Sequence, residues 1–225
     1  MPNWKRNARR LKNNMGLAVL YSRALSGMEA ALVTVEVHLA NGLPNFTIVG
    51  LPETEVKESK DRVRAALQNF GFDFPARRIT VNLAPADLPK EGARFDLPIA
   101  LGILAATGQI PSDKLAEYAG ELALTGELRP IRGALAMTYR AAGNGRAFIL
   151  PQDNAAEATL MENAKIYAHN HCCRWRHTLP DANRLHLMPT GRKVPRHTIQ
   201  TCAKSRDKLK PSVHWKSPPR AGIAF

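Results

Sequence analysis

The sequence predicts an α+β fold in which strands and helices form packed layers. Ile79, Val81 and Leu83 alternate with polar residues, which is the period of a strand with one buried face. Residues 99–106 contain no charged side chain, so they predict a helix that is buried on most sides. Asn41-Gly42 is a strong turn signal between two strand-like runs, and it favours an antiparallel hairpin over a purely parallel sheet.

Two strands are predicted before the strand that contains Ile79, Val81 and Leu83. Residues 17–22 form an apolar, strand-like run, and residues 31–39 alternate between apolar and polar side chains. Residues 44–49 follow the Asn41-Gly42 turn. They are expected to pair with residues 31–39 as the second arm of a β-hairpin.

An amphipathic helix is predicted over residues 52–70. Pro52 lies in its first turn, where a missing N–H costs little, and Gly71 follows its last turn as a C-terminal cap. Glutamates come early in this segment and basic residues come late, as the helix dipole favours. The charged face of the helix is expected to be solvated.

A long loop is predicted between the strand that contains residues 79–83 and the buried helix that contains residues 99–106. Pro85, Pro89 and Gly92 interrupt both periodic patterns, so residues 84–95 form this loop. Asp96 is expected to cap the helix that follows. A loop of this length between two core elements is a typical place for binding or catalysis, and a rigid connector that only packs is the alternative.

The remaining segments continue a mixed order of strands and helices, which again favours α+β over a doubly wound parallel sheet. They are a short turn or helix at 111–116, a strand at 118–125, a hairpin turn at Gly126-Glu127 leading to 128–131, a helix at 133–142, a strand at 147–150, a helix at 154–163 and a strand at 164–167.

The net charge of +13 is concentrated at the two ends of the sequence. Residues 1–14 hold five basic residues and no acidic one, and residues 169–225 hold 12 basic and two acidic residues. Residues 15–168 hold 15 basic and 17 acidic residues and are slightly acidic. We therefore predict one folded domain over 15–168, with Met15 as the natural start and residues 1–14 as a disordered extension. A basic nucleic-acid-binding arm is the alternative for that extension.

The sequence changes character after residue 168. All three cysteines, six of the seven histidines and six prolines lie beyond it, and hydrophobic periodicity disappears. Structural zinc sites separate their paired ligands by several residues so that one turn can wrap the ion. The adjacent residues Cys172 and Cys173 lack this spacing, so no metal site is expected beside His169 and His171.

A shifted reading frame would account for this change of character. Cys172-Cys173-Arg174-Trp175 can be encoded as TGC TGC AGG TGG. The same bases preceded by C read Leu-Leu-Gln-Val, an apolar helical phrase that would continue the domain. Residues 169–225 are therefore expected to be an out-of-frame, disordered basic tail.

The expected location is the cytoplasm, without a membrane partner. No segment approaches the roughly 18 apolar residues that a membrane-spanning helix needs. No apolar signal-peptide region follows the basic N-terminus. Residues 15–168 contain no cysteine, which suits a reducing compartment.

Four motifs carry a resemblance to a known family. They are LPNFTIVGLP at 43–52, VKES at 56–59, NLAPAD at 82–87 and FDLPIA at 95–100. Over residues 15–167 the sequence resembles the N-terminal domain of the magnesium-chelatase-like AAA+ proteins, in particular the ComM-like competence proteins. The resemblance implies the fold of ribosomal protein S5 domain 2, which the proteolytic domain of Lon shares.

In that family the domain precedes an ATPase module. The resemblance implies, for full-length members, hexameric DNA helicases that use ATP and Mg²⁺ to drive branch migration during natural transformation. The 225 residues contain no G-x-x-x-x-G-K-[ST] motif to cradle phosphates and hold Mg²⁺. Gly143 and Gly145 form the nearest glycine pair, and a helix C-terminus explains them better. This chain is therefore expected to bind no cofactor, to hydrolyse no ATP and to unwind no DNA.

The resemblance to Lon also allows a test of peptidase chemistry. A Ser–Lys dyad needs a hydroxyl nucleophile and a lysine that takes its proton. Arg94 corresponds to the nucleophile position of Lon, and Leu135 corresponds to the position of the lysine. Ser59 and Ser112 remain as hydroxyls, but neither has a motif or an evident partner. No catalytic residue is therefore assigned, and an active Lon-like peptidase is disfavoured.

The leading interpretation is a truncated ComM-like N-terminal domain that acts as a non-catalytic assembly or DNA-guiding module. Lys90, Glu91, Arg94 and Asp96 are candidates to contact DNA phosphates or a neighbouring subunit. A local ion pair or cap made by Arg94 and Asp96 is the alternative. An independent nucleic-acid-binding protein that uses its basic ends is a separate hypothesis. The acidic middle argues against strong duplex binding by the domain itself.

Overall fold

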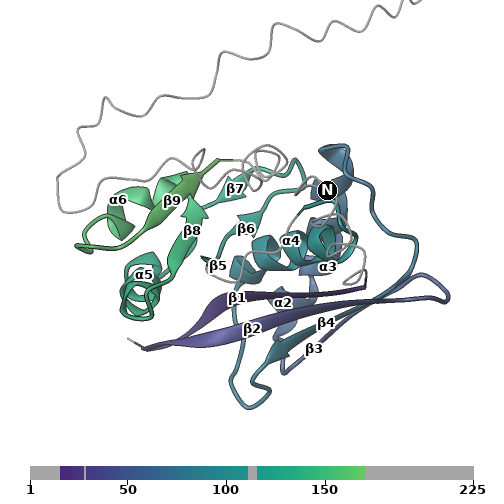
Figure 1. Cartoon of the computed structure of the whole chain (residues 1–225), viewed down its shortest axis with the longest axis horizontal. Helices are drawn as coiled ribbons and strands as arrows, with labels where there is room; N and C mark the ends of the chain where they lie inside the picture. Colours follow the sequence, from purple (N-terminus) through teal and green to yellow (C-terminus); the bar gives the residue numbers. More distant parts are fainter. Residues whose placement is uncertain (1–15, 28, 111–115, 171–225) are drawn as a thin grey trace, which may run out of the picture. The chain divides into compact units, whose positions relative to one another are not determined.

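The computed structural model describes residues 16–27, 29–110 and 116–170 (Figure 1). These residues form a seven-stranded mixed sheet in the order β3-β4-β2-β1-β5-β8-β9, a two-stranded sheet of β6 and β7, and helices packed against them. The predicted α+β class is confirmed. None of the helices in these ranges is long and apolar enough to cross a membrane.

The elements of the structure have the following bounds. The strands are β1 (Leu17–Ser26), β2 (Glu29–Ala40), β3 (Asn45–Val49), β4 (Arg78–Ala84), β5 (Ala116–Tyr118), β6 (Glu121–Leu122), β7 (Leu128–Arg129), β8 (Ala147–Pro151) and β9 (Ile166–His169). The helices are α2 (Thr54–Lys57), α3 (Ser59–Asn69), α4 (Asp96–Ala106), α5 (Ala134–Gly143) and α6 (Ala155–Ala158), with 3₁₀ turns η1 (Ala93–Phe95) and η2 (Gln152–Asn154).

The hairpin predicted around Asn41-Gly42 is wrong. β2 pairs antiparallel with β1 and with β4, while β3 pairs in parallel with β4. The chain leaves β3, passes through α2 and α3, and returns as β4 between β2 and β3. Hydrophobic alternation identifies each strand and its buried face, but it does not say which strand lies beside it. β4 lies inside the sheet, beside the edge strand β3, and the side chains of Ile79, Val81 and Leu83 are buried there.

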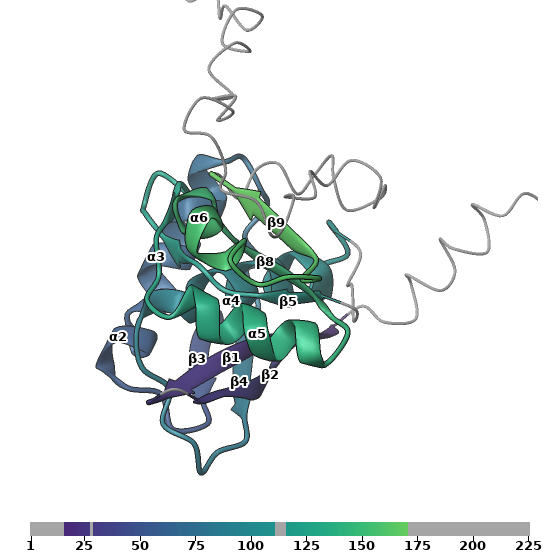
Figure 2. The same ribbon diagram turned by 90° about the vertical axis from the view of Figure 1, so that its left-hand side faces the viewer.

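Helix α4 is the buried centre of the fold, as predicted. Every residue from Asp96 to Ala106 except Ala105 is buried. The helix packs against β1, β2 and α3 (Figure 2). At Gly102 an added Cβ would lie 2.5 Å from Cγ2 of Val37, so the glycine permits a close approach of helix and sheet.

The amphipathic helix predicted over 52–70 is interrupted at Glu58, which separates α2 from α3. Pro52 lies before α2 rather than in its first turn, and it forms an isolated parallel bridge with Lys90. Gly71 follows α3 with a φ of +70°, and its N–H donates to the carbonyl of Gln68 at 3.0 Å. The predicted C-terminal cap at Gly71 is therefore confirmed.

The strand predicted over 118–125 covers only the last residue of β5 and the whole of β6, and Ala119 and Gly120 separate these two strands. The N–H of Gly120 donates to the carbonyl of Arg94 at 2.9 Å, and its carbonyl accepts from the N–H of Leu97 at 3.1 Å. The loop before α4 therefore takes the hydrogen bonds that a neighbouring strand would otherwise take. The antiparallel turn at Gly126-Glu127 is confirmed by the pairing of β6 with β7.

From α5 to β9 the predicted types of element are correct, but some of their predicted bounds differ from those in the structure. α5 ends at Gly143, as the Gly143–Gly145 pair predicted. The helix predicted over 154–163 is shortened to α6, preceded by η2. β9 continues to His169, and the carbonyl of Asn170 accepts from the N–H of Leu128 at 2.8 Å.

The predictions for residues 1–14, 111–115 and 171–225 fall outside the described residues, as do Ser112, Cys172 and Cys173. The domain boundaries and the out-of-frame tail therefore stay predictions.

Gly50 lies in the turn between β3 and α2. It has a φ of +100°, and an added Cβ would overlap the backbone carbonyl of Leu83. We expect Gly50→Ala to lower the free energy of unfolding by more than about 1 kcal/mol in urea denaturation. Gly42→Ala is the matched control, because Gly42 has a φ of +139° but nothing within 4 Å of its added Cβ. Equal losses for the two variants would contradict the role of the overlap.

Candidate functional site

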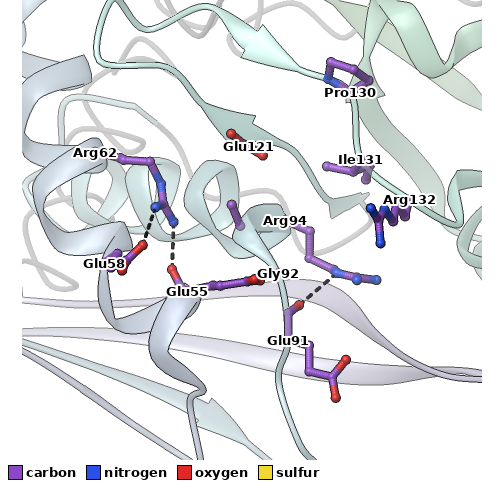
Figure 3. A pocket seen from close by; sticks show the side chains of 11 residues that line it. Glu55, Glu58, Arg62, Glu91, Gly92, Arg94, Glu121, Pro130, Ile131 and Arg132 are labelled. Atoms are coloured by element: carbon purple, nitrogen blue, oxygen red, sulfur yellow. Dashed lines mark hydrogen bonds and ion pairs between the residues drawn. The ribbon is translucent and has the colours of Figure 1, made fainter.

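The structure contains a pocket of about 500 Å³ where four segments meet (Figure 3). These segments are the α2–α3 region, the loop before α4, strand β6 and the segment after β7. The lining residues are Glu55, Glu58, Arg62, Glu91, Gly92, Ala93, Arg94, Glu121, Pro130, Ile131 and Arg132. Seven of them are charged, and none is a serine, threonine, cysteine, histidine or lysine.

Arg94 is the central residue of the pocket's loop side. Its Nε donates to the carbonyl of Glu91 at 3.1 Å, and its buried Nη1 has no hydrogen-bond partner among the described residues. Burial lowers the pKa of Arg94, although the nearby carboxylates of Glu91 and Glu55 act in the opposite direction. Gly92 has a φ of +76°, and an added Cβ would lie 3.3 Å from Nη2 of Arg94, so this turn brings the backbone close to the guanidinium.

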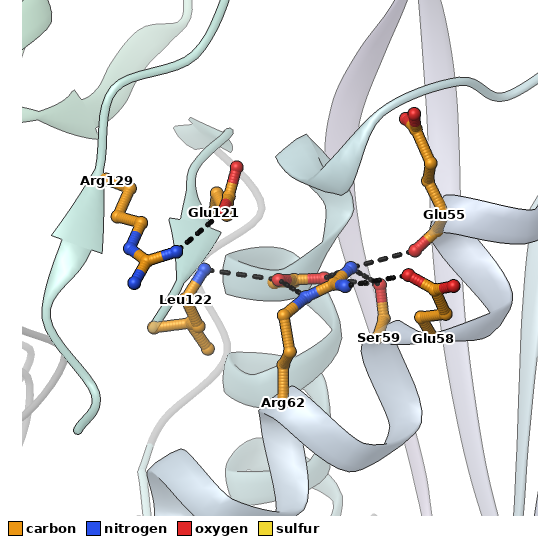
Figure 4. Close-up of polar contacts among 8 residues, drawn as sticks. Glu55, Glu58, Ser59, Arg62, Glu121, Leu122 and Arg129 are labelled. Atoms are coloured by element: carbon orange, nitrogen blue, oxygen red, sulfur yellow. Dashed lines mark hydrogen bonds and ion pairs between the residues drawn. The ribbon is translucent and has the colours of Figure 1, made fainter. Parts of the chain in front are cut away.

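The buried carboxylate of Asp96 binds the pocket residue Arg62, and Figure 4 shows Arg62 beside Ser59 and Leu122. Nε of Arg62 donates to Oδ2 of Asp96 at 2.7 Å, and the backbone N–H of Leu122 donates to the same oxygen at 3.1 Å. The buried hydroxyl of Ser59 donates to Oδ1. The bond to Asp96 raises the pKa of Arg62. Burial raises the pKa of Asp96 and outweighs the hydrogen bonds from Arg62 and Ser59, which favour its charged form.

This cluster corrects two expectations from the sequence. Asp96 is the first residue of α4 and makes no cap hydrogen bond at the helix N-terminus, and its ion-pair partner is Arg62 rather than Arg94. Ser59, which has no evident partner in the sequence, is bound to Asp96 from a helix 37 positions earlier. Side chains that meet across a helix–helix contact leave no local signal at either position.

Lys90 and Asp96 lie inside the protein, whereas Glu91 and Arg94 line the pocket. The Lys90 ammonium donates to the carbonyl of Pro85, and burial lowers the pKa of Lys90. The carbonyl of Lys90 accepts from the N–H of Glu53 at 3.2 Å. Lys90 therefore fixes the loop before α4 to the turn before α2. Of the four loop residues expected to bind a partner, two are buried and two line the pocket.

The glutamates of the pocket differ in their partners. Glu58 contacts Arg62 at 3.5 Å, and Glu121 contacts Arg129 at the same distance. Within the described ranges, the side chains of Glu55 and Glu91 have no ion pair, and the same holds for Arg132. Unpaired groups of both signs therefore border this pocket.

The resemblance to Lon assigns Arg94 and Leu135 to the two positions of its dyad. Arg94 lines the pocket, and Leu135 follows the lining residue Arg132 by three positions at the start of α5. Neither side chain can act as a nucleophile or a general base. Among the described residues, no group of three or more histidine, cysteine or acidic side chains could hold a metal ion. What the pocket can do chemically is recognise charge.

The sequence pattern did not predict that Glu55, Glu58, Glu121 or Arg132 line a pocket. Glu55 and Glu58 lie on the helix whose charged face was expected to be solvated. The only sequence signal for Arg132 was its place beside the Lon-like lysine position. These residues come from three separate segments, so only the folded chain shows that they share a pocket.

Comparison with known proteins agrees with this reading of the fold. Residues 35–154 match the family described as subunit ChlI of Mg-chelatase, which is more than half of the chain. The chain is 56% identical over 155 residues to the competence protein ComM of Haemophilus influenzae, covering 68% of this chain and 30% of that protein. It is 51% identical over 159 residues to the uncharacterized protein YifB of Salmonella typhimurium, covering 70% and 31%.

A more distant match is the Lon protease of Rhizobium meliloti, 27% identical over 158 residues and covering 66% of this chain and 20% of that protein. The chain thus spans about 30% of the length of the ComM and YifB relatives. The match to more than half of the chain, the identities above 50% and the mixed sheet agree with one another. The chain therefore belongs to the Mg-chelatase subunit ChlI family and is a ComM-like member of it.

Proposed function

We propose that this chain is a non-catalytic module of a ComM-like AAA+ system, and that it serves in assembly or in guiding DNA. The observation that carries the proposal is the pocket at Arg94. Arginine and leucine occupy the two positions of the Lon-like dyad, and no hydroxyl or thiol lines the pocket. Distant sequence similarity to a Lon protease relates the domain to a hydrolytic protein, and the charged lining suits recognition.

In this proposal the wider activity belongs to full-length relatives. We propose that those proteins are hexameric ATP-driven helicases that promote DNA branch migration during natural transformation, in the cytoplasm. The name competence protein, carried by the Haemophilus influenzae relative, supports this assignment. The 225 residues contain no phosphate-binding G-x-x-x-x-G-K-[ST] motif, which supports a role without ATP or Mg²⁺ for this chain.

A direct test of the non-catalytic role uses a serine-reactive fluorophosphonate on the purified chain. We expect no stoichiometric labelling, because the Ser59 hydroxyl is fully buried and donates to Asp96. Intact-mass spectrometry after incubation measures the adduct, and a Lon protease serves as the positive control. Phosphonylation of a single serine in the folded chain, with release of fluoride, would contradict the proposal if it is abolished by heat denaturation before incubation.

A second candidate is an independent nucleic-acid-binding protein, and the charge of residues 1–14 and 169–225 favours it. Binding of this kind should weaken steeply with salt, because it depends on counterion release. We expect deletion of residues 169–225 to remove most binding to a fluorescent 30-base-pair duplex, as measured by anisotropy between about 50 and 200 mM salt. Unchanged, salt-dependent binding after the deletion would place the contact within residues 1–168 and would contradict binding through residues 169–225.

A further inference from the structure

The pocket at Arg94 has an uncompensated charge pattern that the proposed assembly role does not by itself explain. Arg62 is engaged by Asp96 and Glu58. Arg94 and Arg132 have no ion-pair partner among the described residues, and Figure 3 shows both guanidinium groups on the same side of the pocket. Two guanidinium groups in this arrangement suit one carboxylate, which can accept hydrogen bonds from both.

Nη1 of Arg94 adds a second, independent observation. It is buried and has no acceptor within the described part of the chain, whereas buried polar groups in native proteins are nearly always hydrogen-bonded. The turn at Gly92 holds the backbone against the same guanidinium. Arg94 therefore lies beside the pocket with a set of hydrogen bonds that the described residues leave incomplete.

The pocket's acidic residues decide which class of partner fits. Four glutamates and three arginines line it, so its formal charge is slightly negative. Glu55 and Glu91 lie close enough to Arg94 to affect its pKa. A nucleic-acid backbone brings a row of negative charges, which these carboxylates would repel. A polypeptide segment with one acidic and one basic side chain matches both signs.

We propose that this pocket binds a mixed-charge polypeptide segment of a partner protein, whose carboxylate pairs with Arg94 and Arg132 and whose basic side chain pairs with Glu55 and Glu91. This inference rests on the proposed assembly function and names the class of partner that it uses. In this proposal Arg94, at the position of the Lon-like nucleophile, serves in recognition instead of catalysis.

The test uses the full chain with ¹⁵N-labelled arginine and follows the Nε–Hε signals by NMR. The probes are acetyl-Asp-Gly-Lys-amide, its analogue acetyl-Asn-Gly-Lys-amide, and a dT₄ oligonucleotide. We expect the aspartate peptide to shift the Arg94 signal and to bind at least tenfold more tightly than the asparagine analogue. Arg94→Gln and Arg132→Gln should each reduce its affinity at least fivefold, whereas the exposed control Arg77→Gln should leave it unchanged.

Three results would overturn the inference. They are no response of the Arg94 signal to the aspartate peptide, equal affinities for the two peptides, or a stronger response to dT₄. Arg132 is exposed, so Arg132→Gln keeps the test decisive even if Arg94→Gln does not fold. Hydrolysis of a probe would contradict the non-catalytic function instead, whereas an intact and unbound peptide contradicts this inference alone.

Discussion

Replacing Glu117 with alanine is expected to lower the free energy of unfolding by about 4 kcal/mol. Its carboxylate is fully buried and accepts from Nε and Nη2 of Arg23 at 2.5 and 2.8 Å. It also lies 3.5 Å from Nη1 of Arg146, whose guanidinium is 4.0 Å from the ring centre of Tyr21. The variant would leave the Arg23 charge buried, since Arg23 is only 3% exposed. Urea denaturation followed by circular dichroism measures the loss.

Two further variants identify the cause of that loss. Glu127→Ala removes an exposed glutamate and should change stability by less than about 0.5 kcal/mol. Replacing the pair together, as Arg23→Met with Glu117→Leu, should recover most of the stability, because a buried ion pair can often be exchanged for apolar side chains of similar volume. A loss below about 1 kcal/mol for Glu117→Ala would show that this ion pair does not hold β1 to β5.

Asp96→Ala is expected to destabilise the protein by about 3 kcal/mol, the lower end of the cost of removing one partner from a buried ion pair. The variant removes the acceptor for the buried Ser59 hydroxyl, the Arg62 guanidinium and the Leu122 N–H. Arg62 remains 20% exposed, so water can partly replace its partner. The loss of stability arises because the Asp96 carboxylate, at the start of α4, accepts hydrogen bonds from side chains of α3 and from a backbone N–H of β6.

The same residue also predicts a dependence of stability on pH. Burial raises the pKa of Asp96 above its ordinary value of 3.8, so the folded protein keeps this proton at a higher pH than the unfolded chain does. The stability that protonation contributes is present below pH 3.8 and is lost as the pH rises through the folded-state pKa. As the pH rises through the folded-state pKa of Asp96, the free energy of unfolding of the native chain should fall relative to that of Asp96→Asn.

Asp61→Ala on the exposed face of α3 is the control for both measurements, and it should leave stability and its pH profile nearly unchanged. A pH profile that is identical for the native chain and Asp96→Asn would contradict the raised pKa. A stable Asp96→Ala variant would contradict the view that this carboxylate joins the three elements.

Much of the fold could be predicted because burial leaves a local pattern. The alternation at Ile79, Val81 and Leu83 identified β4, and the uncharged run at 99–106 identified α4. The loop before α4 was also recognised as the place of the candidate site, and Arg94 lies in its lining. What failed was the choice of strand neighbours around Asn41-Gly42, since pairing depends on contacts between distant segments.

The sequence by itself determined the family and the class of elements, because both follow from residue types and their spacing. Only the tertiary structure decided that Asp96 is paired with Arg62 and Ser59, that Lys90 is buried, and that Arg132 shares a pocket with Arg94. The physical reason is that desolvation and charge pairing depend on which distant side chains meet. The order of residues along the chain does not by itself specify which distant side chains come into contact.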